Sequence, residues 1–177
     1  MDLSLGPNPT GGRQVASNIF DSDRLQTTDF WKDAANRKTW EQICPGEVRQ
    51  SRAVTLTKED IARFASGIGE DNPLYFDEDY AKSTIYGGIV APPSIHILLM
   101  FACTDIDDWM RSPGTINAGQ SWFYNVPARP GDTIEMRGTA LDRFIKKDRL
   151  FVIHENVFTN QKGQVICTGR GWTIRPE

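Results

Sequence analysis

The spacing of apolar residues changes along this 177-residue chain, from a helical period in its first part to strand-like runs in its second. Two apolar stripes with intervals of three and four residues predict amphipathic helices over 58–68 and about 93–104. The first stripe is Ile61, Phe64, Ala65 and Ile68, and the second is Ile95, Leu98, Leu99 and Ala102. Thr57 and Asp60 have the spacing of a capping box, which predicts where the first helix begins.

Four runs rich in β-branched and aromatic residues follow, and each predicts a strand. They span 115–126, 133–145, 149–159 and 164–174, and the turn signals ARPGD, KKD and NQKG separate them. Consecutive strands joined by tight turns predict an antiparallel sheet, and an earlier strand is expected around Val54. The economical arrangement is an α+β fold with one core, in which a single curved antiparallel sheet wraps around one long buried helix.

Composition and charge narrow the class of protein. Residues 1–28 are rich in Gly, Pro, Asn, Ser and Thr and predict a mobile N-terminal arm. Residues 29–177 predict a single domain that opens with a short helix over 30–43. The net charge is −3 and the basic residues are scattered, which disfavours a nucleic-acid partner.

The hydrophobic runs, the first residues and the cysteine spacing are those expected of an ordinary soluble protein. No apolar run approaches the ~20 residues of a membrane span, and the first residues lack the pattern of a secretory signal. We therefore expect a cytoplasmic protein with no membrane partner. Cys44, Cys103 and Cys167 lie far apart without C-x-x-C spacing, so neither disulfides nor a metal site is expected. No cofactor is expected either.

The segment GEDNPLYFDEDYAKSTIYGGIVAPP, residues 69–93, departs from this ordinary pattern. Residues 71–73, Asp-Asn-Pro, predict a tight turn, and the acidic residues 77–79 suit the N-terminus of a short helix. Pro92 and Pro93 suit the opening of the buried helix, because its first N–H groups need no intrahelical acceptor. Turn and capping chemistry alone could account for Asp71 and Asn72.

The order of these elements, together with IGEDNPLYFDEDYA and YGGIVAPP, resembles the hotdog fold of the MaoC-like (R)-specific enoyl-CoA hydratases and dehydratases. Within that superfamily the chain looks most like the N-terminal, dehydratase-like half of double-hotdog and heteromeric members. The resemblance covers roughly residues 47–175, and the central segment is its most specific part.

The resemblance implies a degenerate active site. Competent members carry G-D-x-N-P-x-H, whose Asp and His orient a water and move a proton; here the frame reads G-E-D-N-P-L-Y, with Glu70 and Tyr75 at those positions. The family also has a His-Gly pair at the start of the buried helix, whose glycine N–H binds the thioester oxygen. Pro93 falls on that pair, and proline has no backbone N–H to donate.

The resemblance also suggests substrate-binding positions. Asn72, Tyr86, Gly88, Ile89 and Pro93 are the candidates in the central segment. Lys146 and Arg149 form a small cationic cluster that would suit a coenzyme A phosphate, although they also fit a solvated hairpin tip. His96 and His154 lie outside the motif positions and are predicted to be structural.

Three functions remain open from the sequence. The chain could be the catalytically incomplete subunit of a heteromeric enoyl-CoA hydratase, a lyase of lipid metabolism, paired with a second hotdog chain that carries the intact Asp/His dyad. A bulky acyl-CoA thioester would then be the substrate. It could instead be a self-sufficient homodimeric dehydratase or cyclase that uses Glu70 or Asp71 with Tyr75. A third possibility is a non-catalytic protein that binds an acyl ligand or a partner.

Overall fold

A computed structural model of the chain describes residues 38–49, 51–104 and 114–176. Its five strands form one sheet in the order β1-β3-β4-β5-β2, and every pairing is antiparallel. The strands are β1 (Val54–Thr55), β2 (Ile116–Tyr124), β3 (Thr133–Lys146), β4 (Arg149–Asn160) and β5 (Val165–Arg175). Each of the five sequence-based strand predictions is confirmed, although β1 is only two residues long.

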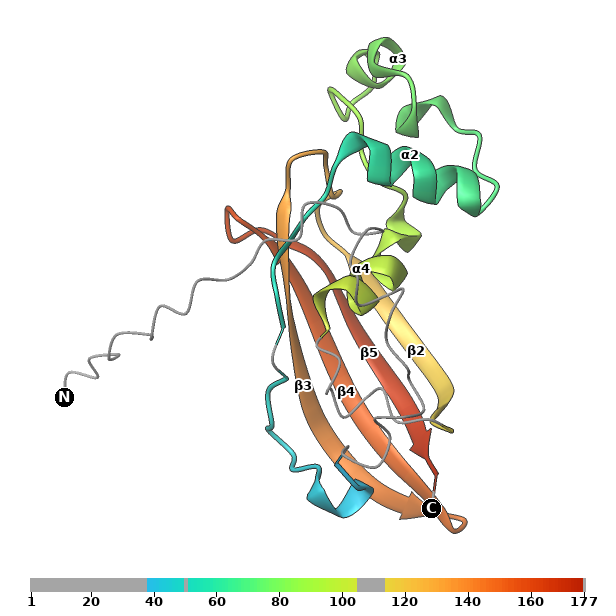
Figure 1. The fold of residues 1–177 in the computed structure, drawn as a ribbon, viewed down its shortest axis with the longest axis vertical. Coiled ribbons are helices and arrows are strands. Elements are labelled where there is room, and N and C mark those ends of the chain that lie inside the picture. Colours follow the sequence, from blue (N-terminus) through green and yellow to red (C-terminus); the bar gives the residue numbers. More distant parts are fainter. Residues whose placement is uncertain (1–37, 50, 105–113, 177) are drawn as a thin grey trace, which may run out of the picture.

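The α-helices lie on one face and beyond one end of this sheet (Figure 1). Helix α4 (His96–Cys103) packs against the sheet face and follows a 3-10 turn, η4 (Pro93–Ile95), so the predicted helix over 93–104 is confirmed as a turn plus eight α-helical residues. Helices α2 (Lys58–Gly67) and α3 (Glu78–Ser83), with η3 (Pro73–Tyr75) between them, sit beyond the end of the sheet.

The capping box at the start of α2 is confirmed. The backbone N–H of Asp60 donates to Thr57 Oγ1 over 3.1 Å, and the backbone N–H of Thr57 donates back to Asp60 Oδ2 over 2.9 Å. These two bonds satisfy N–H groups that the first turn of a helix leaves without partners. Ile61 and Ala65 on the same helix are fully buried in the main core.

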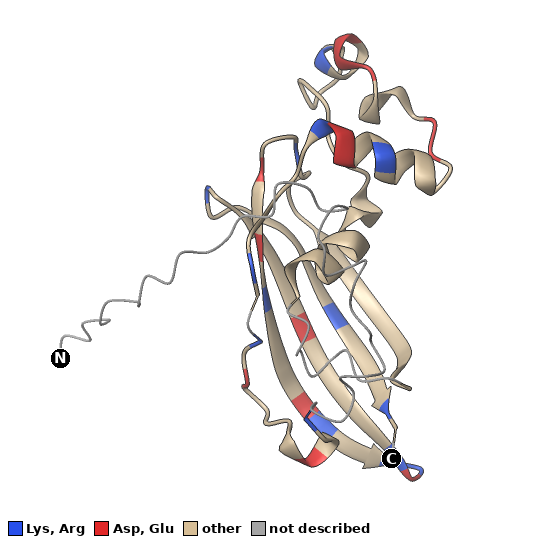
Figure 2. Cartoon of the chain, viewed as in Figure 1, with Lys and Arg blue, Asp and Glu red and all other residues tan. Residues whose placement is uncertain are grey.

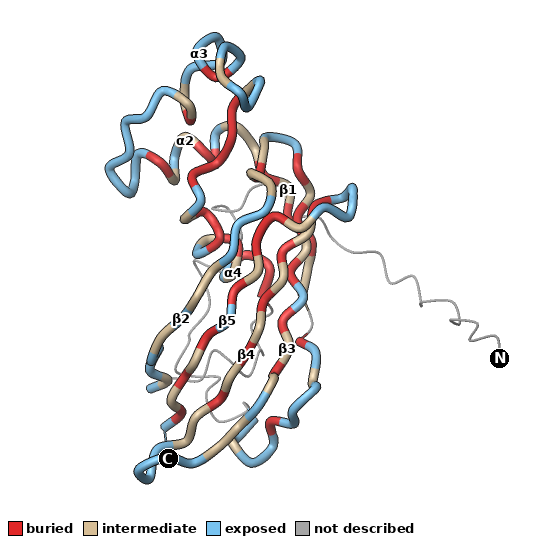
Figure 3. Tube along the Cα trace, turned by 180° about the vertical axis from the view of Figure 1, so that it is seen from behind, coloured by how far each residue is buried: buried red, intermediate tan, exposed pale blue. Residues whose placement is uncertain are grey.

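The sheet, α2, η3 and α4 share that main core. Ile134, Met136 and Phe158 face it from the sheet, and Leu99 faces it from α4. Along β3, β4 and β5 buried residues alternate with less buried ones, as expected when one face of a pleated sheet is covered (Figure 3). The α+β architecture, with an antiparallel sheet and one main core, is therefore confirmed.

The order of the strands corrects one expectation. We expected four consecutive strands with tight turns between neighbours, but β2 pairs with β5, whereas β3 lies on the other side of β4. The segment ARPGD does contain a turn, because the N–H of Arg129 donates to Asp132 Oδ2 over 2.9 Å. That turn joins strands that are not neighbours, since turn chemistry acts locally and does not decide which strands pair.

The other turn signals behave as predicted. Lys147 and Asp148 both have positive φ (50° and 56°) and close the tight hairpin between β3 and β4. In the described part of the chain the helix predicted over 30–43 is represented by one 3-10 turn, η2 (Trp40–Gln42). The mobile arm over 1–28 lies outside the described residues, so the division at 29–177 stays a prediction. No helix in the described part is long and apolar enough to span a membrane.

Candidate functional site

The Asp-Asn-Pro turn is built by its own side chains. The backbone N–H of Leu74 donates to Asn72 Oδ1 over 3.0 Å, which caps the 3-10 turn η3. Asp77 caps α3 in the same way, because its Oδ1 accepts from the N–H groups of Asp79 and Tyr80. Asn72 therefore has a structural role here, as turn chemistry alone would give it.

The two positions that the resemblance assigns to an acid–base pair differ sharply in exposure. Glu70 and the adjacent Asp71 are exposed, whereas Tyr75 is only 8% exposed and belongs to the main core. Burial, followed by the negative charge of Glu70 and by Tyr86, raises the pKa of Tyr75 above its usual value of 10. At neutral pH Tyr75 is therefore a phenol that can donate a hydrogen bond but cannot accept a proton.

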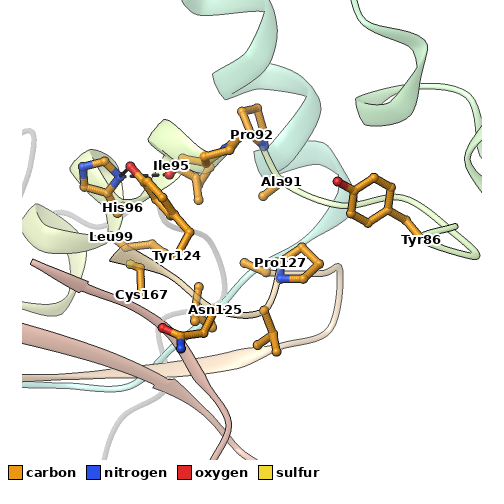
Figure 4. A pocket seen from close by; sticks show the side chains of 14 residues that line it. Tyr86, Ala91, Pro92, Ile95, His96, Leu99, Tyr124, Asn125, Pro127 and Cys167 are labelled. Atoms are coloured by element: carbon orange, nitrogen blue, oxygen red, sulfur yellow. Dashed lines mark hydrogen bonds between the residues drawn. The ribbon is translucent and has the colours of Figure 1, made fainter. Parts of the chain in front are cut away.

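A pocket of about 220 Å³ opens between the start of α4 and the end of β2 (Figure 4). Its walls are mostly apolar, and Ile95, Leu99, Val126 and Ile166 contribute to them. Pro92 and Pro93 form part of the wall at the start of the helix. Two of the predicted binding residues, Tyr86 and Pro93, therefore lie at this pocket, while Ile89 is buried in the core.

Polar side chains line the pocket at more than two places, and Asn125 is one of them. Figure 4 shows His96 and Tyr124 meeting at one end, while Tyr86 stands at the other. His96 Nδ1 lies 2.9 Å from the carbonyl oxygen of Pro93 and 3.1 Å from the hydroxyl of Tyr124. Burial lowers the pKa of His96 and raises the pKa of Tyr124, so both groups are neutral near pH 7. Burial also raises the pKa of the Cys167 thiol to about 12, which keeps it a neutral lining group.

Arg129 supplies a positive charge beside the Tyr86 end of the pocket. Its Nη2 donates to the carbonyl oxygen of Tyr86 over 2.6 Å, and its Nη1 lies over Gly88, 3.8 Å from where a Cβ atom would stand. Within the described ranges, Arg129 forms no ion pair with a carboxylate. Its remaining N–H groups are therefore available to an anionic or carbonyl group of a ligand.

The structure does not bring Lys146 and Arg149 to this pocket within one chain. They face each other across the β3–β4 hairpin, at the end of the sheet opposite to α2 and α3 (Figure 1). Figure 2 shows that the tip of this hairpin carries both charge signs and that basic residues are spread along the chain. The described residues contain no cluster of three or more His, Cys, Asp or Glu that could hold a metal ion.

Sequence reasoning missed His96 and Tyr124 as a pair, and also Arg129. His96 and Tyr124 are 28 residues apart and lie on different elements, so no local motif joins them. The available signals were weak: a histidine at the start of an apolar helix and an aromatic residue near the end of a strand. Arg129 belongs to a turn signal, which carries no information about a site.

Comparison with known proteins agrees with the fold. Residues 44–169 match the family model described as "FAS1-like, dehydratase domain region". A UPF0336 protein from Thermobifida fusca (strain YX) is 30% identical over 119 residues, which cover 64% of this chain and 78% of that protein. An (R)-specific enoyl-CoA hydratase from Rhodospirillum rubrum is 28% identical over 128 residues, covering 71% of this chain and 84% of that enzyme.

Solved structures share the same fold. The MaoC-like dehydratase from Rhodospirillum rubrum superimposes with a TM-score of 0.64 at 25% identity, over 77% of this chain and 97% of that one. The HadBC (3R-hydroxyacyl-ACP dehydratase) complex from Mycobacterium tuberculosis superimposes with a TM-score of 0.63 at 20% identity, over 74% of this chain and 96% of that one. The chain therefore belongs to the FAS1-like dehydratase-region family of the MaoC-like hotdog superfamily.

Proposed function

We propose that this chain is a subunit of a heteromeric enoyl-CoA hydratase and that it lacks a complete catalytic set of its own. The reaction is the syn addition of water to a trans-2-enoyl-CoA. A second hotdog chain with an intact Asp/His dyad supplies the acid–base chemistry. Similarity to the (R)-specific enoyl-CoA hydratase of Rhodospirillum rubrum supports the reaction, and the HadBC complex is an example of this fold in an assembly.

The observation that carries the proposal is the state of Tyr75. A hydratase needs a group that takes a proton from water near neutral pH, and efficient general bases have pKa values close to the working pH. The pKa of Tyr75 is moved further above 10, and its neighbour Glu70 lies out in solvent. Pro93, at the start of the helix, also has no N–H for a thioester oxygen, and one missing donor of this kind typically costs ~10²–10³ in rate.

The apolar pocket supports a role in holding the acyl group, which in this proposal is bulky. Burial of a hydrocarbon chain there is favourable by roughly 25 cal/mol per Å² of apolar surface. Arg129 is better placed than Lys146 or Arg149 to meet the charged carrier, because its guanidinium adjoins the Tyr86 end of the pocket.

The test compares the chain alone with a co-purified complex. A hotdog chain with G-D-x-N-P-x-H, encoded next to this chain in the genome, is co-expressed with it. Hydration of trans-2-octenoyl-CoA is then monitored through the decrease in the absorbance of the enoyl group. We expect fast turnover only in the complex, and loss of turnover when the partner's Asp is changed to Asn. Equal turnover by this chain alone would refute the proposal.

A homodimeric dehydratase or cyclase is the second candidate, because Glu70 is close enough to Tyr75 to raise its pKa. In that case the chain alone converts the enoyl-CoA substrate. The double variants that combine Tyr75→Phe with Glu70→Gln or with Asp71→Asn then abolish the reaction. Under the first candidate these variants change the rate of the complex by less than about two-fold. Binding of octenoyl-CoA without turnover, with and without the partner, would instead support a protein that only binds the acyl ligand.

A further inference from the structure

We infer that the Tyr124 hydroxyl is the hydrogen-bond donor that this chain presents to a carbonyl oxygen of the ligand, and that His96 is the residue that positions it. The inference rests on the proposed function, because it takes the pocket to receive an acyl thioester. It assigns a specificity-determining role to a pair that no motif marks. The direction of each hydrogen bond follows from the groups that make it.

The tautomer of His96 follows from its neighbours. A carbonyl oxygen can only accept a hydrogen bond, so Nδ1 at 2.9 Å from the Pro93 oxygen must carry the proton. The same N–H also faces the Tyr124 oxygen at 3.1 Å. The phenol oxygen is therefore the acceptor in its contact with His96, and its own hydrogen is left for another group. This tautomer is assigned from the hydrogen-bond network, which is the usual way to assign histidine tautomers.

The pair is held in place by packing. His96 is only 5% exposed, and its ring lies against Trp122, with ring centroids 3.9 Å apart and an angle of 37° between the planes. Tyr124, by contrast, is 50% exposed at the end of β2 and lines the pocket. The anchoring residue is therefore buried, while the residue that it orients is half exposed. A donor oriented before the ligand arrives binds more tightly, because less freedom is lost on binding.

The wall of the pocket explains why such a donor is useful there. Pro92 and Pro93 form the wall at the start of α4, and neither has a backbone N–H. A further N–H at the helix start is also engaged, since Ile95 N donates to the Pro92 oxygen over 2.9 Å. A carbonyl placed at this wall would have no backbone donor from Pro92, Pro93 or Ile95, and Tyr124 lines the same pocket.

The first test reads the tautomer without any ligand. The chain has two histidines, so long-range ¹H–¹⁵N correlation spectra of the wild type and of His154→Gln assign the signals of His96. We expect a neutral ring protonated at Nδ1 at pH 7.5. A ring protonated at Nε2 would make Tyr124 the donor to His96 and would overturn the inference.

The second test separates the carbonyl from the rest of the ligand. Binding of trans-2-octenoyl-CoA and of the thioether S-octyl-CoA, which lacks the carbonyl, is measured on the chain alone and in the co-purified complex. We expect Tyr124→Phe to weaken the thioester about five- to ten-fold, the loss of one hydrogen bond, and to leave the thioether within two-fold. Tyr80→Phe, on the exposed helix α3, is the matched control and should change neither.

The positioning role of His96 has its own readout. An asparagine amide can place an N–H near the position of Nδ1, so His96→Asn should retain more of the preference for the thioester than His96→Ala does. Equal losses for thioester and thioether in Tyr124→Phe, or no loss at all, would overturn the inference while the hydratase proposal stands. Failure of both ligands to bind the wild-type chain and the complex would overturn both.

Discussion

Replacing Gly169 with alanine tests how tightly Trp122 is packed against the sheet beside His96. Gly169 on β5 pairs with Trp122 on β2, and the indole ring lies across the space where a side chain would stand. A Cβ atom at Gly169 would be 2.3 Å from Trp122 Cζ3 and 2.4 Å from Cη2. Ordinary carbon contacts are about 3.5 Å or longer, so the ring must move by about an ångström or more.

The indole has little room to move. Its other neighbours include His96, with ring centroids 3.9 Å apart, and Phe158, with centroids 6.1 Å apart. Trp122 Nε1 is buried and has no hydrogen-bond partner among the described residues, so packing rather than hydrogen bonding fixes the ring. Inserting one methyl group into such a site typically costs about 1–3 kcal/mol. We expect Gly169→Ala to lower the free energy of unfolding by that amount.

Urea unfolding followed by circular dichroism measures this change. With a slope of about 1–3 kcal/mol per molar urea, the midpoint should fall by roughly 1 M. Gly67→Ala is the matched control, because Gly67 ends α2, and a methyl group added there would have no atom within 4 Å apart from its chain neighbours and the backbone of its own helix. This control should gain up to about 1 kcal/mol from helix propensity. If Gly169→Ala were as stable as the wild type, the inference that packing fixes the indole ring of Trp122 would be refuted.

Three further outcomes are expected. Thr57→Ala should lose about 1 kcal/mol of stability, because it removes the cap of α2, while Thr57→Ser should retain most of it; urea midpoints measure both. Burial lowers the pKa of His154 from 6.5 to about 3, so the unfolded chain takes up a proton that the folded chain does not. Stability should therefore fall as the pH drops from 6.5 towards 3, by up to ~1.4 kcal/mol per pH unit, and a flat profile that matches His154→Gln would contradict this. A thiol reagent should modify one cysteine of the native chain and three in urea, because Cys44 is exposed and burial raises the pKa of Cys103 and Cys167 to about 12; rapid reaction of all three in the native chain would be the contrary result.

Local patterns predicted most of the elements of this fold. The stripe through Ile61 and Ala65, the capping box at Thr57 and the four long strand runs all describe interactions between residues close in sequence, and the structure confirms them. The last member of the stripe, Ile68, lies just past the end of α2 and is exposed. The pairing of β2 with β5 could not be read in this way. It depends on which strands bury their faces together around α4, and the ARPGD turn gives no information about that choice.

The site was predictable only where a motif marked it. The G-E-D-N-P-L-Y frame located Glu70 and Tyr75, but their contrast in exposure came from the packing of η3 against the core. The cationic cluster at Lys146 and Arg149 was visible as a run of charge, yet its distance from the pocket is set by the length of the β3–β4 hairpin. The contact between His96 and Tyr124 required the strand order, which local spacing does not encode.

The position of β2 at the edge of the sheet links ligand binding to assembly. Among the described strands, β2 pairs on one side only, with β5, and its last residue is Tyr124 of the pocket. A strand of another chain that paired with β2 would restrain the same backbone that carries this hydroxyl. If association of the two chains raised the affinity for the ligand by some factor, the ligand would raise the affinity of the chains for each other by the same factor, because the two effects are thermodynamically linked. The apparent affinity of the subunits for each other would then rise with the concentration of acyl ligand.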